Sequence, residues 1–284
     1  PMLGCHGFTR HLIFQYPILQ LIAKMIHQRS FAMQISVLLN SKIQGLLILM
    51  ILTGFFQEVL AHTLFDVPQV TELKKSNNNI VIGHGCGGSP VIGTSIVFPD
   101  GNDSVITAGN DPHSGGISSF IQNWGNLIQL LQNRSVFSEQ DEKLDANGNV
   151  IGFWSGGGRS LAANLNAHIP FTTSAVVFEP ESCASSVRFA VAIVDVCKIT
   201  TIANFTEDAV SLWVPAVGSK YDGVPGSHAY DSPAFFTVNR DLESSPLPES
   251  CGGNGIEVLV KPSAAQVDRD MPILYNGTQV WPQP

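Results

Sequence analysis

The sequence predicts an all-β fold of the sandwich class. Three observations point to it: many short runs rich in β-branched and aromatic residues, frequent turn residues between those runs, and one long run that is apolar on both faces. The chain has 26 Gly and 17 Pro in 284 residues, and many of them separate the apolar runs. Short strands at close spacing favour two packed sheets.

The predicted strands all lie after residue 62. One of them follows Asn147-Gly148, a dipeptide typical of tight hairpin turns. Residues 218–232, rich in Gly, Pro and Ser, are predicted to form a loop. The strands are expected at 79–82, 91–98, 150–154, 169–178, 187–197, 210–214, 234–238 and 256–260.

The run from Val187 to Cys197 is the predicted centre of the sandwich. Alternate residues of a strand point to opposite faces. Here one face carries Val, Phe, Val, Ile and Asp195, and the other carries the Ala and Val residues at 190, 192, 194 and 196. Because both faces are largely apolar, we expect this strand to be covered on both sides.

One segment departs from the strand pattern. Apolar residues recur at helical spacing between Ile117 and Leu131, with Gln and Asn between them. We therefore expect an inserted amphipathic helix over about 115–133 that covers the core of the sandwich. A helix that binds a partner is the alternative.

Residues 33–61 are typical of a signal peptide. They hold Met33 as a start, the basic Lys42, an apolar stretch from Leu46 to Phe56, and a small residue, Ala61, at the cleavage position. The alternative is an uncleaved anchor over 43–60, but its apolar run is short for a spanning helix of about 20 residues. The expected organisation is an upstream extension over 1–32, the signal peptide, and a single mature domain over 62–284.

The charge of the mature part excludes several classes of partner. Residues 1–61 hold four of the 15 basic and one of the 23 acidic residues, which leaves 11 basic and 22 acidic residues, a net charge of −11. Such a chain is poorly suited to bind nucleic acid or an anionic membrane surface. It suits a domain that is periplasmic, secreted or at the cell surface, and it can attract cations.

Four cysteines follow Ala61: Cys86, Cys183, Cys197 and Cys251. An even number in an exported chain predicts two disulfides, with three pairings open. No Cys-x-x-Cys pair is present, which disfavours zinc-ribbon and thioredoxin-like sites.

Cleavage after Ala61 would make His62 the first residue of the mature chain. An N-terminal His offers its α-amine and its imidazole to one metal, and the α-amine has a pKa near 8, so it loses its proton readily. Cu(II) prefers nitrogen and oxygen ligands in a tetragonal plane. The position of His62 therefore predicts a copper ligand.

Three further stretches carry a family resemblance: His84-Gly-Cys-Gly-Gly-Ser-Pro90 with the strand and Pro-Asp-Gly101 turn after it, Trp154-Ser-Gly-Gly157 followed by a strand containing Phe171, and His62-Thr-Leu64. Together they span about 62–180 and resemble the YcnI-like family of copper-binding proteins (DUF1775). The segment 115–133 and residues 218–284 match no part of it.

The resemblance implies a cupredoxin- or immunoglobulin-like β-sandwich, exported from the cytoplasm, that binds Cu(II) for copper uptake, delivery or buffering. It implies a brace from His62, a carboxylate ligand and a neighbouring Trp, which here is Trp154. Glu139 is the first choice for the carboxylate, with Asp111 and Glu142 as alternatives. A membrane copper transporter or another copper carrier is the implied partner.

Other readings stay open at this point. His84 lies beside Cys86 and is either close to the metal or a turn residue that bonds backbone carbonyls. A second brace histidine among His113, His168 and His228 would instead favour a copper oxygenase of the polysaccharide monooxygenase type. A structural surface sandwich without metal is the third possibility. A Gly-x-Ser-x-Gly elbow is absent, which disfavours a nucleophilic hydrolase.

Overall fold

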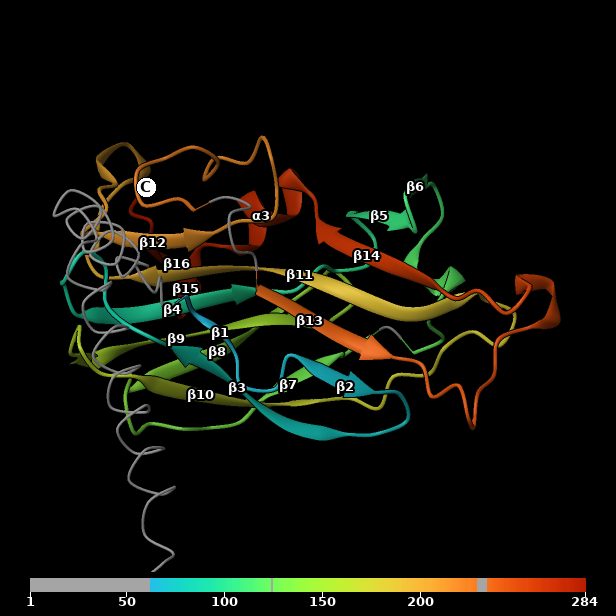
Figure 1. Cartoon of the computed structure of the whole chain (residues 1–284). Helices are drawn as coiled ribbons and strands as arrows, with labels where there is room; N and C mark the ends of the chain where they lie inside the picture. Colours follow the sequence, from blue (N-terminus) through green and yellow to red (C-terminus); the bar gives the residue numbers. More distant parts are fainter. Residues whose placement is uncertain (1–61, 124, 229–233) are drawn as a thin grey trace, which may run out of the picture. The chain divides into compact units, whose positions relative to one another are not determined.

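The computed structural model describes residues 62–123, 125–228 and 234–284. The expectations for 1–32 and for the signal peptide at 33–61 lie outside these residues. The described part is mostly β-structure in which two sheets pack face to face, so the predicted all-β sandwich is confirmed (Figure 1).

The smaller sheet has four strands and runs along one side of the sandwich (Figure 1). Its first strand starts at Leu64, two residues after His62, and pairs antiparallel with the neighbouring strand of the sheet. The order is β1 (Leu64–Phe65), β3 (Ser76–Ile82), β10 (Ala167–Thr173) and β7 (Ile128–Leu130).

The larger sheet has ten strands and is organised around β11 (Ala184–Val196). Its main path is β6 (Asp111–His113), β5 (Ser104–Ala108), β14 (Ile256–Pro262), β11, β4 (Val91–Val97), β9 (Val150–Leu161) and β8 (Glu139–Leu144). The strands β12 (Val210–Trp213) and β13 (Ala234–Asn239) also pair with β11, and β2 (Gln69–Thr71) pairs with β13.

The central position predicted for 187–197 is confirmed. The β11 residues Phe189, Val191 and Ile193 belong to the core between the two sheets, while Ala192 and Val194 face a second apolar cluster on the other side. The strand is long enough to pair with β13 and β14 along its first half and with β4 and β12 along its second half.

Phenylalanine rings fill the space between the sheets. Phe65 of β1 lies 5.6 to 6.0 Å, between ring centroids, from Phe98, Phe171 and Phe236, and Phe171 also contacts Phe153. All five side chains are at most 3% exposed. The contribution of such rings scales with the apolar area that they bury, and this cluster fixes the start of β1 against both sheets.

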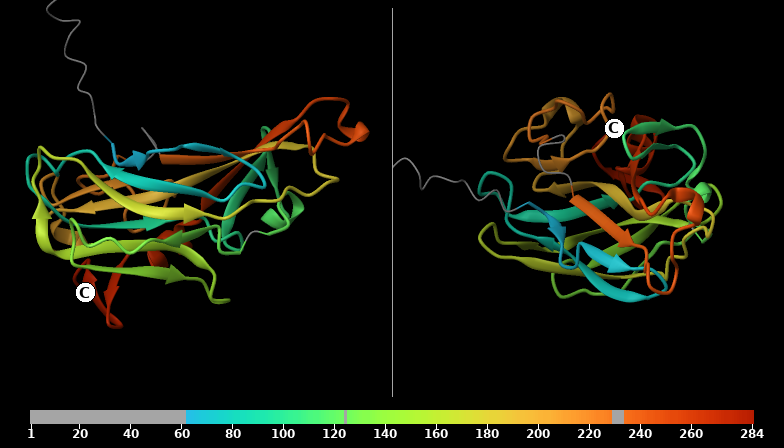
Figure 2. Two further views of the ribbon diagram at one scale, coloured as in Figure 1. Left: turned by 90° about the horizontal axis from the view of Figure 1, so that it is seen from below. Right: turned by 45° about the vertical axis from the view of Figure 1, so that its right-hand side comes forward.

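The second apolar cluster lies on the outer face of the larger sheet, where the helix α3 (Ala264–Asp270) and the hairpin of β15 (Ile273–Tyr275) and β16 (Thr278–Trp281) cover it (Figures 1 and 2). Ser263 caps α3 because its side chain accepts a hydrogen bond from the backbone N–H of Gln266. The 3-10 turns of the described residues are Ile117–Ser119, Ile202–Asn204 and Glu249–Cys251.

The prediction of a helix over 115–133 is wrong. The described residues of this segment form the 3-10 turn at Ile117–Ser119, an isolated bridge from Ile121 to Phe178, and the strand β7. Five apolar side chains of the segment are buried, those of Ile117, Phe120, Ile121, Leu127 and Ile128. The backbone of Gln122, however, donates to Val177 and that of Leu131 to Pro170, so the hydrogen bonds run to other segments. Asn126 adopts φ +56, a left-handed conformation that interrupts a helix.

The two disulfides predicted from the cysteines are confirmed. Cys86 is joined to Cys197, and Cys183 to Cys251. The first bridge ties the turn before β4 to the end of β11, and the second ties the start of β11 to the segment before β14. Disulfides of this kind are typical of chains that fold in an oxidising compartment. Among the described residues, none of the helices has the length and apolar character needed to cross a membrane.

Candidate functional site

His62 lies against the tryptophan that ends β12. The indole Nε1 of Trp213 donates a hydrogen bond of 2.8 Å to Nδ1 of His62, and the two rings meet edge to face with centroids 5.5 Å apart. Trp213 is 2% exposed and is held in register opposite Ile193 of β11. The side chain of His62 is thus positioned by a buried residue of the central part of the larger sheet.

A second histidine lies on the same tryptophan. The ring of His228 stacks on that of Trp213 with centroids 5.4 Å apart and an interplanar angle of 14°. Its backbone N–H donates to the carbonyl of Leu212, so β12 fixes its place. The rings of His62 and His228 have centroids 6.1 Å apart. Trp213 therefore brings together two imidazoles that are 166 positions apart in the sequence.

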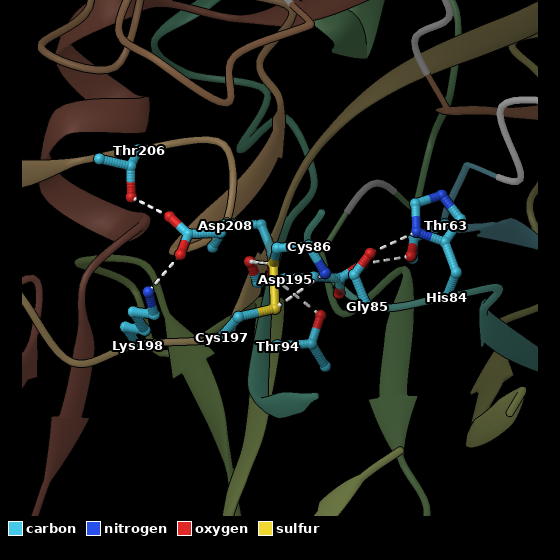
Figure 3. Close-up of a disulfide and its surroundings, with 11 residues drawn as sticks. Thr63, His84, Gly85, Cys86, Thr94, Asp195, Cys197, Lys198, Thr206 and Asp208 are labelled. Atoms are coloured by element: carbon cyan, nitrogen blue, oxygen red, sulfur yellow. Dashed lines mark hydrogen bonds and ion pairs between the residues drawn. A yellow bond between two sulfur atoms is a disulfide. The ribbon is translucent and has the colours of Figure 1, made fainter. Parts of the chain in front are cut away.

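The residue after His62 is anchored inside the sandwich. Thr63 Oγ1 donates to Oδ2 of Asp195 on β11 at 2.5 Å, and both residues are at most 2% exposed (Figure 3). Oδ1 of Asp195 has no hydrogen-bond partner within the described part of the chain. Burial raises the pKa of Asp195 to about 6, although the hydroxyls of Thr63 and Thr94 and the charge of His84 act in the opposite direction.

His84 belongs to the turn that the first disulfide holds against β11 (Figure 3). Its Nδ1 lies 2.5 Å from the carbonyl oxygen of Gly85, as in the turn-residue reading, and its charge acts on Asp195. A Cβ on Gly85 would lie 1.8 Å from the carbonyl oxygen of Ser89, so only glycine fits there. The His-Gly-Cys turn thus has a structural reason for its composition.

Glu139 and Trp154 lie in another part of the molecule. Glu139 begins β8, which is separated from β12 by β11, β4 and β9, or roughly 19 Å at the usual spacing of neighbouring strands. Trp154 of β9 belongs to the outer apolar cluster, whereas Trp213 belongs to the core between the sheets. Glu139 and Trp154 line a hollow of about 330 Å³ that also includes Tyr275.

The remaining sequence-derived candidates lie on β6, β8 and β10. The ring of His113 lies 4.7 Å from that of Phe120, and His168 is exposed on β10. Asp111 is exposed on β6, and Oε1 of Glu142 accepts a hydrogen bond from the backbone of Leu130.

The candidate metal donors at this site are the imidazoles of His62 and His228. The buried carboxylate of Asp195 is joined to the next residue, Thr63. No group of three or more His, Cys, Asp or Glu side chains among the described residues is arranged to hold a metal ion. A three-donor site at His62 therefore requires a donor that is not a side chain, and the α-amine of a mature N-terminus is one. The sequence named His228 only as one of three possible second histidines. Trp213, which joins the two, carries no motif that marks it.

No family model matches this chain, and no curated protein is similar to it at a significant level.

Proposed function

We propose that the mature protein is an exported Cu(II)-binding protein whose site is built on its own N-terminus. Cleavage after Ala61 releases the α-amine of His62, and the ligands are that amine, the imidazole of His62 and the imidazole of His228. Three nitrogen donors of this kind suit the tetragonal preference of Cu(II). Export is supported by the leader-like sequence before His62 and by the two disulfides.

The observation that carries the proposal is the 6.1 Å between the ring centroids of His62 and His228. An imidazole nitrogen binds a metal at about 2 Å, so two rings that share one ion from opposite sides have centroids roughly 6 Å apart. The separation of the two rings fits that arrangement.

One hydrogen bond must be exchanged when the site is formed. The chelate with the α-amine uses Nδ1 of His62, the atom that accepts the Trp213 bond here. In the chain before cleavage the backbone nitrogen of His62 is a peptide amide, so the ring position described here is the one before the amine is released. His228 remains stacked on Trp213 and needs no such change.

Copper uptake, delivery or buffering is the role we favour, with a membrane copper transporter or another copper carrier as partner. The YcnI-like resemblance of residues 62–180 supports this role, whereas the pair of histidines taken alone favours the second candidate function given below. Glu139 and Trp154 are not included in the proposed site, since they lie on β8 and β9.

A second candidate function is a copper oxygenase of the polysaccharide monooxygenase type. The specific observation in its favour is the second histidine, because two imidazoles and an amine are the ligand set expected of that class. Incubation with copper, ascorbate, oxygen and polysaccharide separates the two roles. Oxidised oligosaccharides would establish the oxygenase and contradict the carrier role.

The test of the copper site uses protein 62–284 with a free N-terminus. Cu(II) titration followed by electron paramagnetic resonance should show one ion bound through nitrogen, and removal with EDTA should reverse it. His228→Ala should weaken binding by more than the roughly 10- to 100-fold that loss of an outer-shell partner costs. His168→Ala, an exposed histidine of β10, is the matched control and should change nothing.

A single glycine placed before His62 tests the amine ligand. It removes the α-amine of His62 from the chelate and should change both the affinity and the spectrum. If the extended protein and the His228→Ala variant bind Cu(II) like the unmodified protein, the proposed site is wrong. Absence of any Cu(II) binding would instead favour a structural surface sandwich.

A further inference from the structure

Four Asn-x-Ser/Thr sequences occur in the part of the chain after His62, and such sequences are acceptors of N-linked glycans in exported proteins. They begin at Asn102, Asn133, Asn204 and Asn276. The four asparagines differ in the hydrogen bonds that they make and in the space around them.

Asn276 occupies the tip of the hairpin between β15 and β16. Tyr275 pairs with Thr278, which leaves Asn276 and Gly277 as a two-residue turn with φ +49 and φ +75. Both signs suit the type I′ turn that Asn-Gly favours. Asn276, Gly277 and Thr278 are all exposed, and the space where Gly277 would carry a Cβ is open. The whole acceptor triplet is therefore exposed at the tip of the hairpin.

The surface beside Asn276 has room for sugars and a composition that suits them. Asn276 and Gly277 line a hollow of about 330 Å³ between this hairpin and β8. Leu144 and Leu274 also line it and are 57% and 49% exposed. Asp141 contributes a carboxylate to the same hollow. Apolar surface can pack against the face of a sugar ring, and carboxylates accept hydrogen bonds from its hydroxyls.

Two of the other acceptors have engaged side chains. Asn133 is half-buried, and its Oδ1 accepts a hydrogen bond from the backbone N–H of Ser135. Nδ2 of Asn204, the atom that would carry a sugar, donates to Thr201 at 3.1 Å. Asn102 lies in the tight turn 100–103, where its backbone N–H donates to Asp100.

We propose that Asn276 is an N-glycosylation site and that the first sugars of its glycan lie over the hollow beside β8. In the reaction, Nδ2 of Asn276 forms a bond to C1 of the first sugar of a lipid-diphosphate-linked oligosaccharide. The bond from C1 to the phosphate oxygen breaks, the amide loses one proton, and the lipid diphosphate leaves. This inference rests on the export included in the proposed function, but not on copper binding.

The experiment compares three proteins secreted from a eukaryotic cell: the unchanged chain, Thr278→Ala and Thr278→Ser. Thr278→Ala removes the acceptor sequence and keeps Asn276, whereas Thr278→Ser keeps the sequence. Each is made with residues 1–61 and, in parallel, with an established secretion leader directly before His62. Peptide mass spectrometry before and after peptide N-glycosidase gives the occupancy of Asn276.

We expect Asn276 to be occupied in the unchanged chain and in Thr278→Ser, and to be unmodified in Thr278→Ala. Hydrogen exchange of the β8 segment 139–144 should be slower in the occupied proteins. Unmodified Asn276 in protein secreted with the established leader would overturn the site, and equal exchange in all three would overturn the position of the glycan. Secretion with the established leader alone would contradict the proposed leader while leaving the glycan site supported.

Discussion

Thr63 and Asp195, 132 positions apart in the sequence, are joined by a buried hydrogen bond of 2.5 Å from the threonine hydroxyl to the carboxylate. This bond holds the residue that follows His62 against the central strand β11. We predict that Thr63→Val costs about 1 to 3 kcal/mol of unfolding free energy, because it leaves a buried carboxylate oxygen without its donor. Urea unfolding of protein 62–284 measures this.

The same variant should weaken Cu(II) binding by about tenfold, since it loosens the backbone beside a ligand. Thr63→Ser is the control, because it keeps the hydroxyl and changes only the packing of the methyl group. An affinity that stays constant in Thr63→Val while stability falls would show that the bond supports the fold only.

Asp195 should make the stability of the metal-free protein depend on pH. Its pKa is raised to about 6 in the folded protein against 3.8 for an ordinary Asp, so the folded state binds the proton more tightly. Its contribution to stability is fully present below pH 3.8 and is lost as the pH rises through 6. The loss is on the order of 3 kcal/mol.

Asp195→Asn isolates this effect, because the amide oxygen still accepts from Thr63 and carries no charge. Its advantage over the unchanged protein, measured in EDTA by urea unfolding, should grow between pH 4 and pH 7.5. A difference between the two proteins that stays constant across this range would contradict the raised pKa.

Trp213 should report Cu(II) binding by its fluorescence. Its indole contacts the imidazoles of both proposed ligands, so bound Cu(II) lies close enough to quench its emission. We predict that Trp213→Phe removes most of the quenching, while Trp154→Phe, on the outer face of the larger sheet, leaves it intact. Quenching that disappears only in Trp154→Phe would place the copper in the hollow lined by Glu139, Trp154 and Tyr275.

Glu139 provides the sharpest comparison with the ligand set implied by the family resemblance. We predict that Glu139→Gln leaves the Cu(II) affinity and the paramagnetic spectrum unchanged, because β8 lies across three intervening strands from β12. A loss of tenfold or more in the titration would bring Glu139 back as a ligand.

The strands could be predicted where their residues face a packed surface. The run 187–197 reads as a two-sided strand because both of its faces are apolar, and β11 is buried on both faces. The strand β8, with the sequence Glu-Gln-Asp-Glu-Lys-Leu, lies at an edge of the sheet. Its residues are almost all polar, so no apolar pattern predicts it. The apolar spacing of 115–133 suggested a helix, but the period reflects burial in a loop whose hydrogen bonds run elsewhere.

The candidate site could be predicted only in part. His62 was accessible from the sequence because cleavage chemistry depends on a few adjacent residues. Its neighbours depend on pairing between distant strands: Trp213 reaches His62 since β12 pairs with β11, and no local pattern encodes that pairing. Glu139 is a candidate carboxylate ligand only by its residue type, and residue type carries no information on the order of strands in the sheet.

The early burial of Phe65 sets an order of events for the maturation of this chain. Phe65 is the fourth residue after the expected cleavage point, and its side chain is packed among rings from both sheets, while β1 is paired with β3. A peptidase needs several extended residues on both sides of the bond that it cuts, which the folded domain does not offer after His62. If the leader is removed as we propose, its removal must precede closure of the sandwich, since a chain that folds first would keep the amine of His62 blocked.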